Sequence, residues 1–127
     1  MKIIRFQVGF LGTNCYLACC ERTAKCAIID PGGNEQEILH QIQADRLTAE
    51  CIINTHGHAD HIMADQPLKT ALAVPVCIHR DDAELLLDSR LNVSMFFGNG
   101  YTGEPADRLL TDGDIIKIGE ENLRVIH

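Results

Sequence analysis

Four side chains that bind metal ions in proteins lie within six consecutive residues of this chain. They are His56, His58, Asp60 and His61, and only a glycine and an alanine separate them. Imidazole nitrogens suit zinc and iron, and a carboxylate adds the negative charge that a divalent cation attracts. The pattern predicts a metal centre; the alternative interpretation is a histidine-rich surface turn.

The spacing of these residues fits an extended loop better than a helix. Ligands on one helical face recur at i and i+4, as in the H-E-x-x-H motif. In contrast, His56, His58 and Asp60 recur at every second position, so they point the same way in an extended segment. His61 breaks this alternation and can therefore address a second ion beside the first.

The segments before this loop predict strands and one helix that bring it into place. Strand-like patterns cover residues 2–8, 14–19 and 26–29, and Asn34 is predicted to cap a helix with an apolar stripe. The buried strand Cys51–Asn54 then leads directly into the metal loop. Open α/β sheets bind their ligands at the carboxyl ends of strands, so this position favours a functional site.

The segments after the loop predict further helices and strands. The patterns indicate helices over 62–72 and 83–87, a strand over 75–78, and a closing meander of strands over 107–110, 114–118 and 123–126. Pro67 is compatible with the first of these helices only near its first turn or at a kink. His79, an isolated histidine, is expected to be structural.

The segment 88–106 is the least regular part of the chain and contains half of its aromatic residues. Met95-Phe96-Phe97 and Tyr101 lie there among glycines. We expect these aromatic side chains to pack under a long loop, with contact to a substrate as the alternative.

The run Thr55-His56-Gly57-His58-Ala59-Asp60-His61 resembles the T-H-x-H-x-D-H signature of the metallo-β-lactamase superfamily. The flanking sequence, from Asn14-Cys15-Tyr16 through Asp30-Pro31-Gly32, is similar to the glyoxalase II-like (hydroxyacylglutathione hydrolase-like) hydrolases. The resemblance implies an α/β (α+β) fold, namely the N-terminal half of an αββα sandwich, with a mixed sheet and flanking helices. Residues 1–127 would form one such domain, incomplete at its C-terminal end.

The resemblance also implies a role for each residue of the site. His56 and His58 would hold one zinc ion, and Asp60 and His61 a second, with iron as the alternative metal. Asp60 would also be catalytic, because it would orient the nucleophile. Asp30 would support the metal loop from behind; its alternative interpretation is an ordinary turn aspartate.

Two ligands for each ion are fewer than the three that a catalytic zinc ion usually takes. In the family a T-P-G-H-T loop downstream supplies a further histidine, and His127 matches the residue before that loop. His127 is therefore only a substitute candidate. We also expect the inner face of the sheet to lack a partner layer, so that a homodimer would cover it.

Three functional hypotheses follow from the resemblance. The first is a hydrolase in which metal-activated water attacks a small thioester such as a hydroxyacylglutathione. The second is an iron-dependent oxidoreductase similar to the persulfide dioxygenases. The third is a non-catalytic half-domain that needs a partner or the missing C-terminal ligands.

Composition limits the choice of partners and compartment. The net charge of −7 and the lack of a basic run argue against nucleic acid and anionic membranes as partners. No run is apolar enough for a transmembrane helix, and polar residues interrupt the N-terminal segment, so we expect a cytoplasmic protein. The six cysteines form no C-x-x-C pair and are expected to pack as reduced thiols; the alternative is a redox pair at Cys19 and Cys20.

Overall fold

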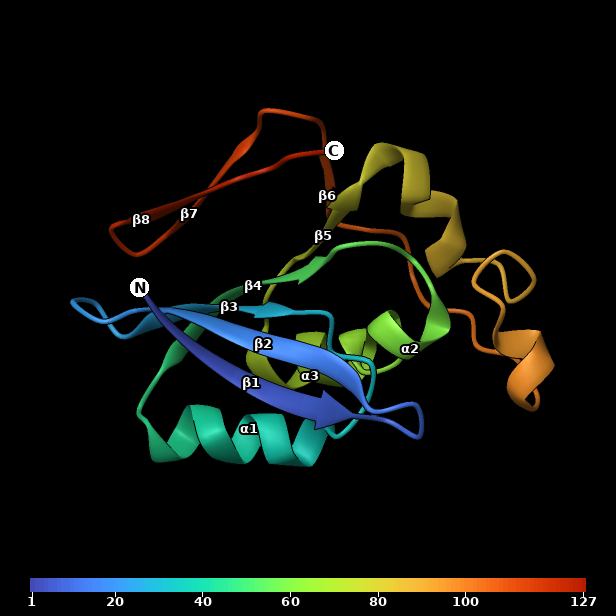
Figure 1. Ribbon diagram of the computed structural model, residues 1–127, viewed down its shortest axis with the longest axis horizontal. Coiled ribbons are helices and arrows are strands. Elements are labelled where there is room, and N and C mark those ends of the chain that lie inside the picture. The colour runs from blue at the N-terminus through green and yellow to red at the C-terminus, as the bar shows by residue number, and fades with distance from the viewer.

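The strands of the main sheet follow one another in the order of the sequence, β1-β2-β3-β4-β5-β6. The computed structural model describes residues 1–127, and Figure 1 shows the arrangement. The first two pairs of neighbours are antiparallel and the remaining three are parallel, which confirms the predicted mixed sheet. The strands are β1 (Lys2–Val8), β2 (Thr13–Cys20), β3 (Lys25–Ile29), β4 (Thr48–Asn54), β5 (Val76–His79) and β6 (Arg108–Leu110).

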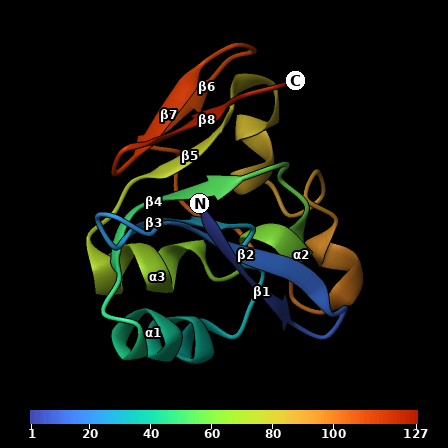
Figure 2. The ribbon, with the colours of Figure 1, turned by 60° about the vertical axis from the view of Figure 1, so that its left-hand side comes forward.

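Two helices, α1 (Glu35–Ala44) and α3 (Asp65–Leu72), cover one face of this sheet (Figures 1 and 2). Ile38 and Ile42 of α1 are buried against the sheet, as the apolar stripe predicts. Asn34 occupies the predicted N-cap position, but its side chain makes no capping hydrogen bond. Its Oδ1 instead accepts the N–H of Gly9, so the residue ties the β1–β2 loop to the start of the helix.

The helix predicted over 62–72 is present and ends at Leu72 as predicted, but it begins at Asp65 instead of residue 62. A short helix α2 (Ala59–Ile62) precedes α3, which begins at Asp65. The N–H of Ala64 donates to the carbonyl of Pro31, and this long-range bond holds the junction between the two helices. Pro67 is the third residue of α3, within the first turn where a proline is tolerated.

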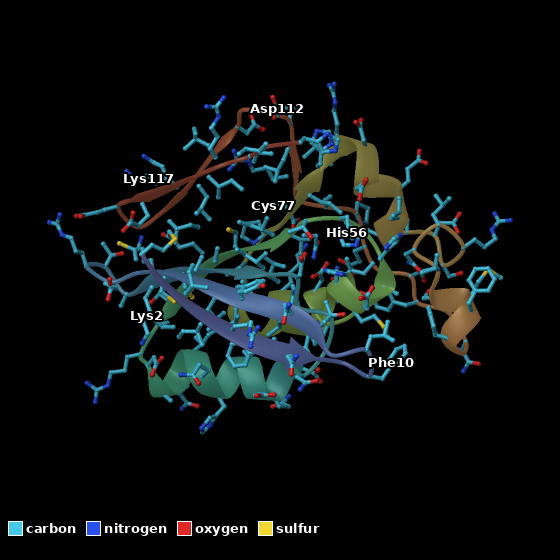
Figure 3. All side chains as sticks on the ribbon, viewed as in Figure 1. Lys2, Phe10, His56, Cys77, Asp112 and Lys117 are labelled. Atoms are coloured by element: carbon cyan, nitrogen blue, oxygen red, sulfur yellow. The ribbon has the colours of Figure 1, made fainter.

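The three strands of the predicted closing meander are present, but the first of them does not pair with the second. Strand β6 pairs with β5 in the main sheet, whereas β7 (Ile115–Ile118) and β8 (Glu121–Arg124) form a separate hairpin. This hairpin lies over the sheet face opposite α1 and α3 (Figure 2). Ile116 and Ile118 are buried there with Cys51 and Cys77, and Figure 3 labels Cys77 between the two layers.

The expectation of an inner face without a partner layer is therefore wrong. The alternation of β7 directs Ile116 and Ile118 onto that face, while Ile115 remains exposed. The cover leaves a pocket of about 300 Å³ between the sheet and β8.

Irregular structure makes up most of the remaining chain. The helix predicted over 83–87 is a 3₁₀ helix, η1 (Arg80–Leu86), and a second one, η2 (Ser94–Phe97), lies in the segment 88–106. All six cysteines are free and buried, as expected for thiols that pack as small apolar groups. No helix has the length and apolar character needed to span a membrane.

Candidate metal centre

The four predicted ligands come together where β4 ends and α2 begins. The rings of His56 and His58 meet edge to face with their centroids 4.8 Å apart, and those of His56 and His61 are 4.1 Å apart. Nε2 of His61 lies 3.4 Å from Oδ2 of Asp60. Figure 3 labels His56 in this loop, beside α2. The alternation at His56, His58 and Asp60 thus produces a cluster rather than a dispersed surface turn.

Asp60 is held in place from a distant strand. The hydroxyl of Thr13, the first residue of β2, donates to Asp60 Oδ2 at 2.6 Å. This charge-assisted hydrogen bond fixes one carboxylate oxygen and links the β1–β2 loop to the metal loop.

Asp30 lies behind the loop, as the resemblance implies. Its carboxylate accepts both the N–H of Thr55, at 2.7 Å, and the hydroxyl of Thr55, at 2.6 Å. Oδ2 of Asp30 also lies 3.0 Å from Nδ1 of His61. The carboxylate therefore contacts the metal loop rather than its own turn, and its position can orient both ends of the motif.

Two glycines allow the backbone segments around the site to approach closely. A Cβ on Gly32 would lie 1.5 Å from the carbonyl oxygen of Asp60, and one on Gly57 would lie 2.4 Å from Cβ of Leu85. The N–H of Gly57 donates to Asp82 at 3.0 Å. The loop is therefore packed between the Asp30-Pro31-Gly32 turn and η1.

The donor set suits a divalent transition-metal ion. Burial lowers the pKa of His56, and the neighbouring rings of His61 and His58 lower it further, so the imidazole is kept neutral with a free lone pair. Nδ1 of His61 is buried and forms no hydrogen bond, although Asp30 is near. Neutral imidazoles beside a carboxylate are the ligands that zinc and iron bind. The residues present therefore fit the metal that the motif predicts.

A second group of metal-binding side chains was not expected from the sequence. His79, Asp81 and His127 have ligand atoms within 4.8 Å of one another, and the rings of His79 and His127 are stacked with centroids 3.4 Å apart. His79 Nδ1 already accepts the N–H of Asp81, which gives His79 the structural role predicted for it. His127 therefore lies beside His79, and no spacing in the sequence indicates this contact.

A buried polar pair supports the loop from the helix side. Nδ2 of Asn54 donates to the carbonyl of His61 at 3.3 Å and to Asp65 Oδ1 at 3.1 Å. Burial raises the pKa of Asp65 well above its ordinary value. Sequence reasoning missed this pair, because Asn54 is read as the end of a strand and Asp65 as a helix residue.

The expectation that the aromatic side chains of 88–106 pack under a loop is wrong for two of them. Phe96 and Phe97 are exposed, and Phe97 instead contacts Phe10 of the β1–β2 loop. Only Tyr101 packs against the core. Backbone hydrogen bonds within the segment hold η2 in place, so the helix does not require these rings to be buried.

Comparisons with known proteins agree with this geometry. The sequence model of the Metallo-beta-lactamase superfamily matches residues 8–127. The chain is 34% identical to the "Probable metallo-hydrolase YqgX" of Bacillus subtilis over 127 residues, which cover 99% of this chain and 59% of YqgX.

Solved structures show the same fold. The crystal structure of the B3 metallo-beta-lactamase BLEG-1 superimposes with a TM-score of 0.90 at 30% identity, over 99% of this chain and 61% of that one. TTHA1623 in a di-iron-bound form matches with a TM-score of 0.75 at 28% identity, over 87% and 55% of the two chains. The chain thus has the N-terminal part of this fold and spans about three fifths of the length of YqgX and BLEG-1.

Proposed function

The chain belongs to the metallo-beta-lactamase superfamily, and from this membership we propose that it carries the metal centre of a glyoxalase II-like hydrolase acting on small thioesters. The observation that carries the proposal is the cluster of three imidazoles and one carboxylate after β4, with Asp30 behind it. A thioester carbonyl is the type of group that metal-assisted hydrolysis acts on.

Each residue has a role in this proposal. His56 and His58 hold one ion, and Asp60 and His61 hold the other. When bound, such ions acidify water and polarise a carbonyl group, which makes hydrolysis feasible near neutral pH. Asp60 accepts the Thr13 hydroxyl through Oδ2, so its other oxygen is left to orient the water that attacks.

Asp30 acts as a positioning residue. Its two contacts with Thr55 fix the start of the motif, and its approach to His61 Nδ1 directs Nε2 of that ring toward Asp60. A carboxylate behind a ligating histidine also raises the basicity of the imidazole.

The proposal predicts metal binding that depends on the loop histidines. Elemental analysis after gel filtration should find zinc in the wild-type chain, and His58→Ala should weaken zinc affinity by about tenfold or more, because it removes an exposed ligand. His40→Ala is the matched control, since His40 is an exposed residue of α1. Zinc-loaded protein should then hydrolyse S-lactoylglutathione. Metal-free protein, or equal affinities in both variants, would contradict the proposal.

Iron chemistry is a second candidate, because TTHA1623 is described in a di-iron-bound form. A dioxygenase acting on a persulfide would contain iron and consume oxygen. Iron in the purified protein together with oxygen uptake on adding glutathione persulfide would replace the hydrolase proposal.

A third candidate is a non-catalytic half-domain. The four clustered side chains provide only two ligands for each of two ions, and the chain spans 59% of YqgX. A homodimer, or another chain, would then supply the remaining ligands. Metal binding that appears only in a dimeric fraction would favour this candidate.

A further inference from the structure

His58 differs from Asp60 and His61 in the way it is held. Thr13 contacts Asp60 and Asp30 contacts His61 through their side chains. The ring of His58 is exposed and meets only the ring of His56, and no hydrogen bond from outside the motif reaches it. An exposed imidazole can occupy several rotamers, so its direction depends on how firmly the backbone beneath it is fixed.

The backbone around His58 is fixed by two hydrogen bonds from outside the loop. The N–H of Gly57 donates to Oδ2 of Asp82 at 3.0 Å, and the N–H of Ala59 donates to the carbonyl of Asn92, also at 3.0 Å. The first bond fixes the peptide group that follows His56, and the second fixes the one that follows His58. Because a peptide group is planar, each bond limits the direction in which its histidine leaves the chain.

Both acceptors belong to one connected support. Asp82 lies on η1, and Nδ2 of Asn92 donates to the carbonyl of Leu85, on the same 3₁₀ helix, at 2.9 Å. Asn92 is fully buried. It therefore joins η1 to the point that holds Ala59, and Asp82 holds the loop from the other side of His58.

Gly57 is pressed against this support. A Cβ at Gly57 would lie 2.4 Å from Cβ of Leu85 and 3.2 Å from the carbonyl oxygen of Asp82. Figure 3 labels His56 beside the yellow coil of η1. The Asp82 carboxylate is a charged acceptor, which makes its bond to the Gly57 N–H stronger than a bond between neutral groups. η1 thus limits the freedom that a glycine would otherwise give the loop.

Building on the proposed function, we propose that Asp82 is a positioning residue for the ion that His56 and His58 hold. Its carboxylate fixes the backbone between the two histidines, so that both imidazoles are directed toward one ion before the ion binds. Without this bond, ion binding would have to order the loop, and the affinity would fall accordingly.

The first test compares zinc affinities, measured by competition with a chromophoric chelator. Asp82→Ala should weaken zinc binding by about 10- to 100-fold, as is usual when a partner behind the ligands is removed. Asp82→Asn keeps an oxygen that can accept the Gly57 N–H, so its affinity should return to within about threefold of wild type. Glu84→Gln is the matched control, because it removes a charge from an exposed position on the same η1.

A second readout separates positioning from a general loss of stability. In the metal-free protein, Asp82→Ala should speed amide hydrogen exchange at Gly57 by about tenfold or more, while the buried strand residue Ile52 stays protected. With cobalt(II) in place of zinc, the visible absorption spectrum of Asp82→Ala should differ from that of wild type, because the imidazoles meet the ion in a different geometry. Asp82→Asn should restore both signals.

Three results would overturn the positioning role. They are equal zinc affinities in wild type and Asp82→Ala, no recovery in Asp82→Asn, and an equal loss in Glu84→Gln, which would indicate a general effect of charge.

The same measurements also test the proposed function separately. The predicted order of zinc affinities without any thioester hydrolysis would support the role of Asp82 and refute the hydrolase proposal. A wild-type chain that binds no zinc would refute the metal centre itself, and the role of Asp82 with it.

Discussion

Two of the predicted ligands in the metal loop, Asp60 and His61, are contacted by residues from outside the motif. Thr13 fixes Asp60, Asp30 lies against His61, and Asn54 donates to the His61 carbonyl. The contiguous motif was readable from the sequence, because its chemistry is contained in one run of residue types. The role of Asp30 came from the resemblance, and the Asn54–Asp65 pair was missed. That contact joins the end of a strand to the second helix after it, and only the fold brings these together.

Asp65 provides a residue-scale prediction about pH. Burial raises its folded-state pKa, so the native state favours the protonated form more than the unfolded state does. Its contribution to stability is therefore present below the ordinary aspartate pKa and is lost as pH rises through the folded-state value. Asparagine does not titrate, so Asp65→Asn should be more stable than wild type at pH 8 by about 1–3 kcal/mol, with a smaller or reversed difference near pH 4.

Urea unfolding at the two pH values measures this difference. Asp45→Asn removes the same charge from an exposed position and should show no comparable gain at pH 8. A stability difference for Asp65→Asn that stays constant from pH 4 to pH 8 would mean that Asp65 does not titrate in that range.

At the scale of elements, the Asp30-Pro31-Gly32 turn determines how closely α2 can approach the sheet. Gly32→Ala would place a Cβ 1.5 Å from the Asp60 carbonyl, so α2 and the metal loop would have to move. We expect a loss of about 3 kcal/mol in stability together with weaker metal binding. Chemical unfolding and a zinc titration measure the two effects.

Gly12→Ala is the control for this prediction. Gly12 has a positive φ, of +64°, and a Cβ there would meet nothing within 4 Å. Gly12→Ala should lower the free energy of unfolding by only about 1 kcal/mol, from backbone conformation alone. Equal losses for the two variants would show that the close approach at Gly32 is unimportant.

Most strands could be predicted from the sequence because their patterns are local. The pairing of strands could not be predicted where it depends on contacts between residues far apart in the sequence. Residues 2–8 alternate and form β1 over that range. The three C-terminal strands were also located, but their pairing was not. Asp107 accepts the Val76 N–H and a bond from Lys69, and these contacts draw β6 to the edge of the main sheet. The bond from Ala64 to Pro31 likewise lies at the break between the two helices, where local propensity predicted one.

For the whole molecule, the β7–β8 hairpin provides a second layer that the resemblance did not lead us to expect. Ile118 is fully buried beneath it, and Ile115 in the same strand is 49% exposed. Ile118→Ala should lower stability by about 2–5 kcal/mol, while Ile115→Ala should change it by about 0.5 kcal/mol or less. Unfolding curves for both variants test whether this layer contributes to the fold. Similar small effects would mean that the hairpin is only loosely attached.

This cover also changes the reason for expecting a homodimer. An open inner face was the argument for a second copy, and the hairpin now covers the part of that face formed by Ala27, Cys51 and Cys77, beside the pocket between the sheet and β8. The homodimer remains a prediction. Gel filtration of wild type and Ile118→Ala measures the oligomeric state. A dimer that forms only in the variant would show that the apolar surface that dimerises lies under the hairpin.

The six buried thiols can be used to follow the unfolding of individual strands. They are distributed over β2, β3, β4 and β5, and burial raises the pKa of Cys15 and of Cys26 to about 12. Since the thiolate is the reactive form, alkylating reagents should act mainly on molecules in which a strand has opened. Mass spectrometry of the labelled peptides would then give the order in which the strands open, without any engineered cysteine.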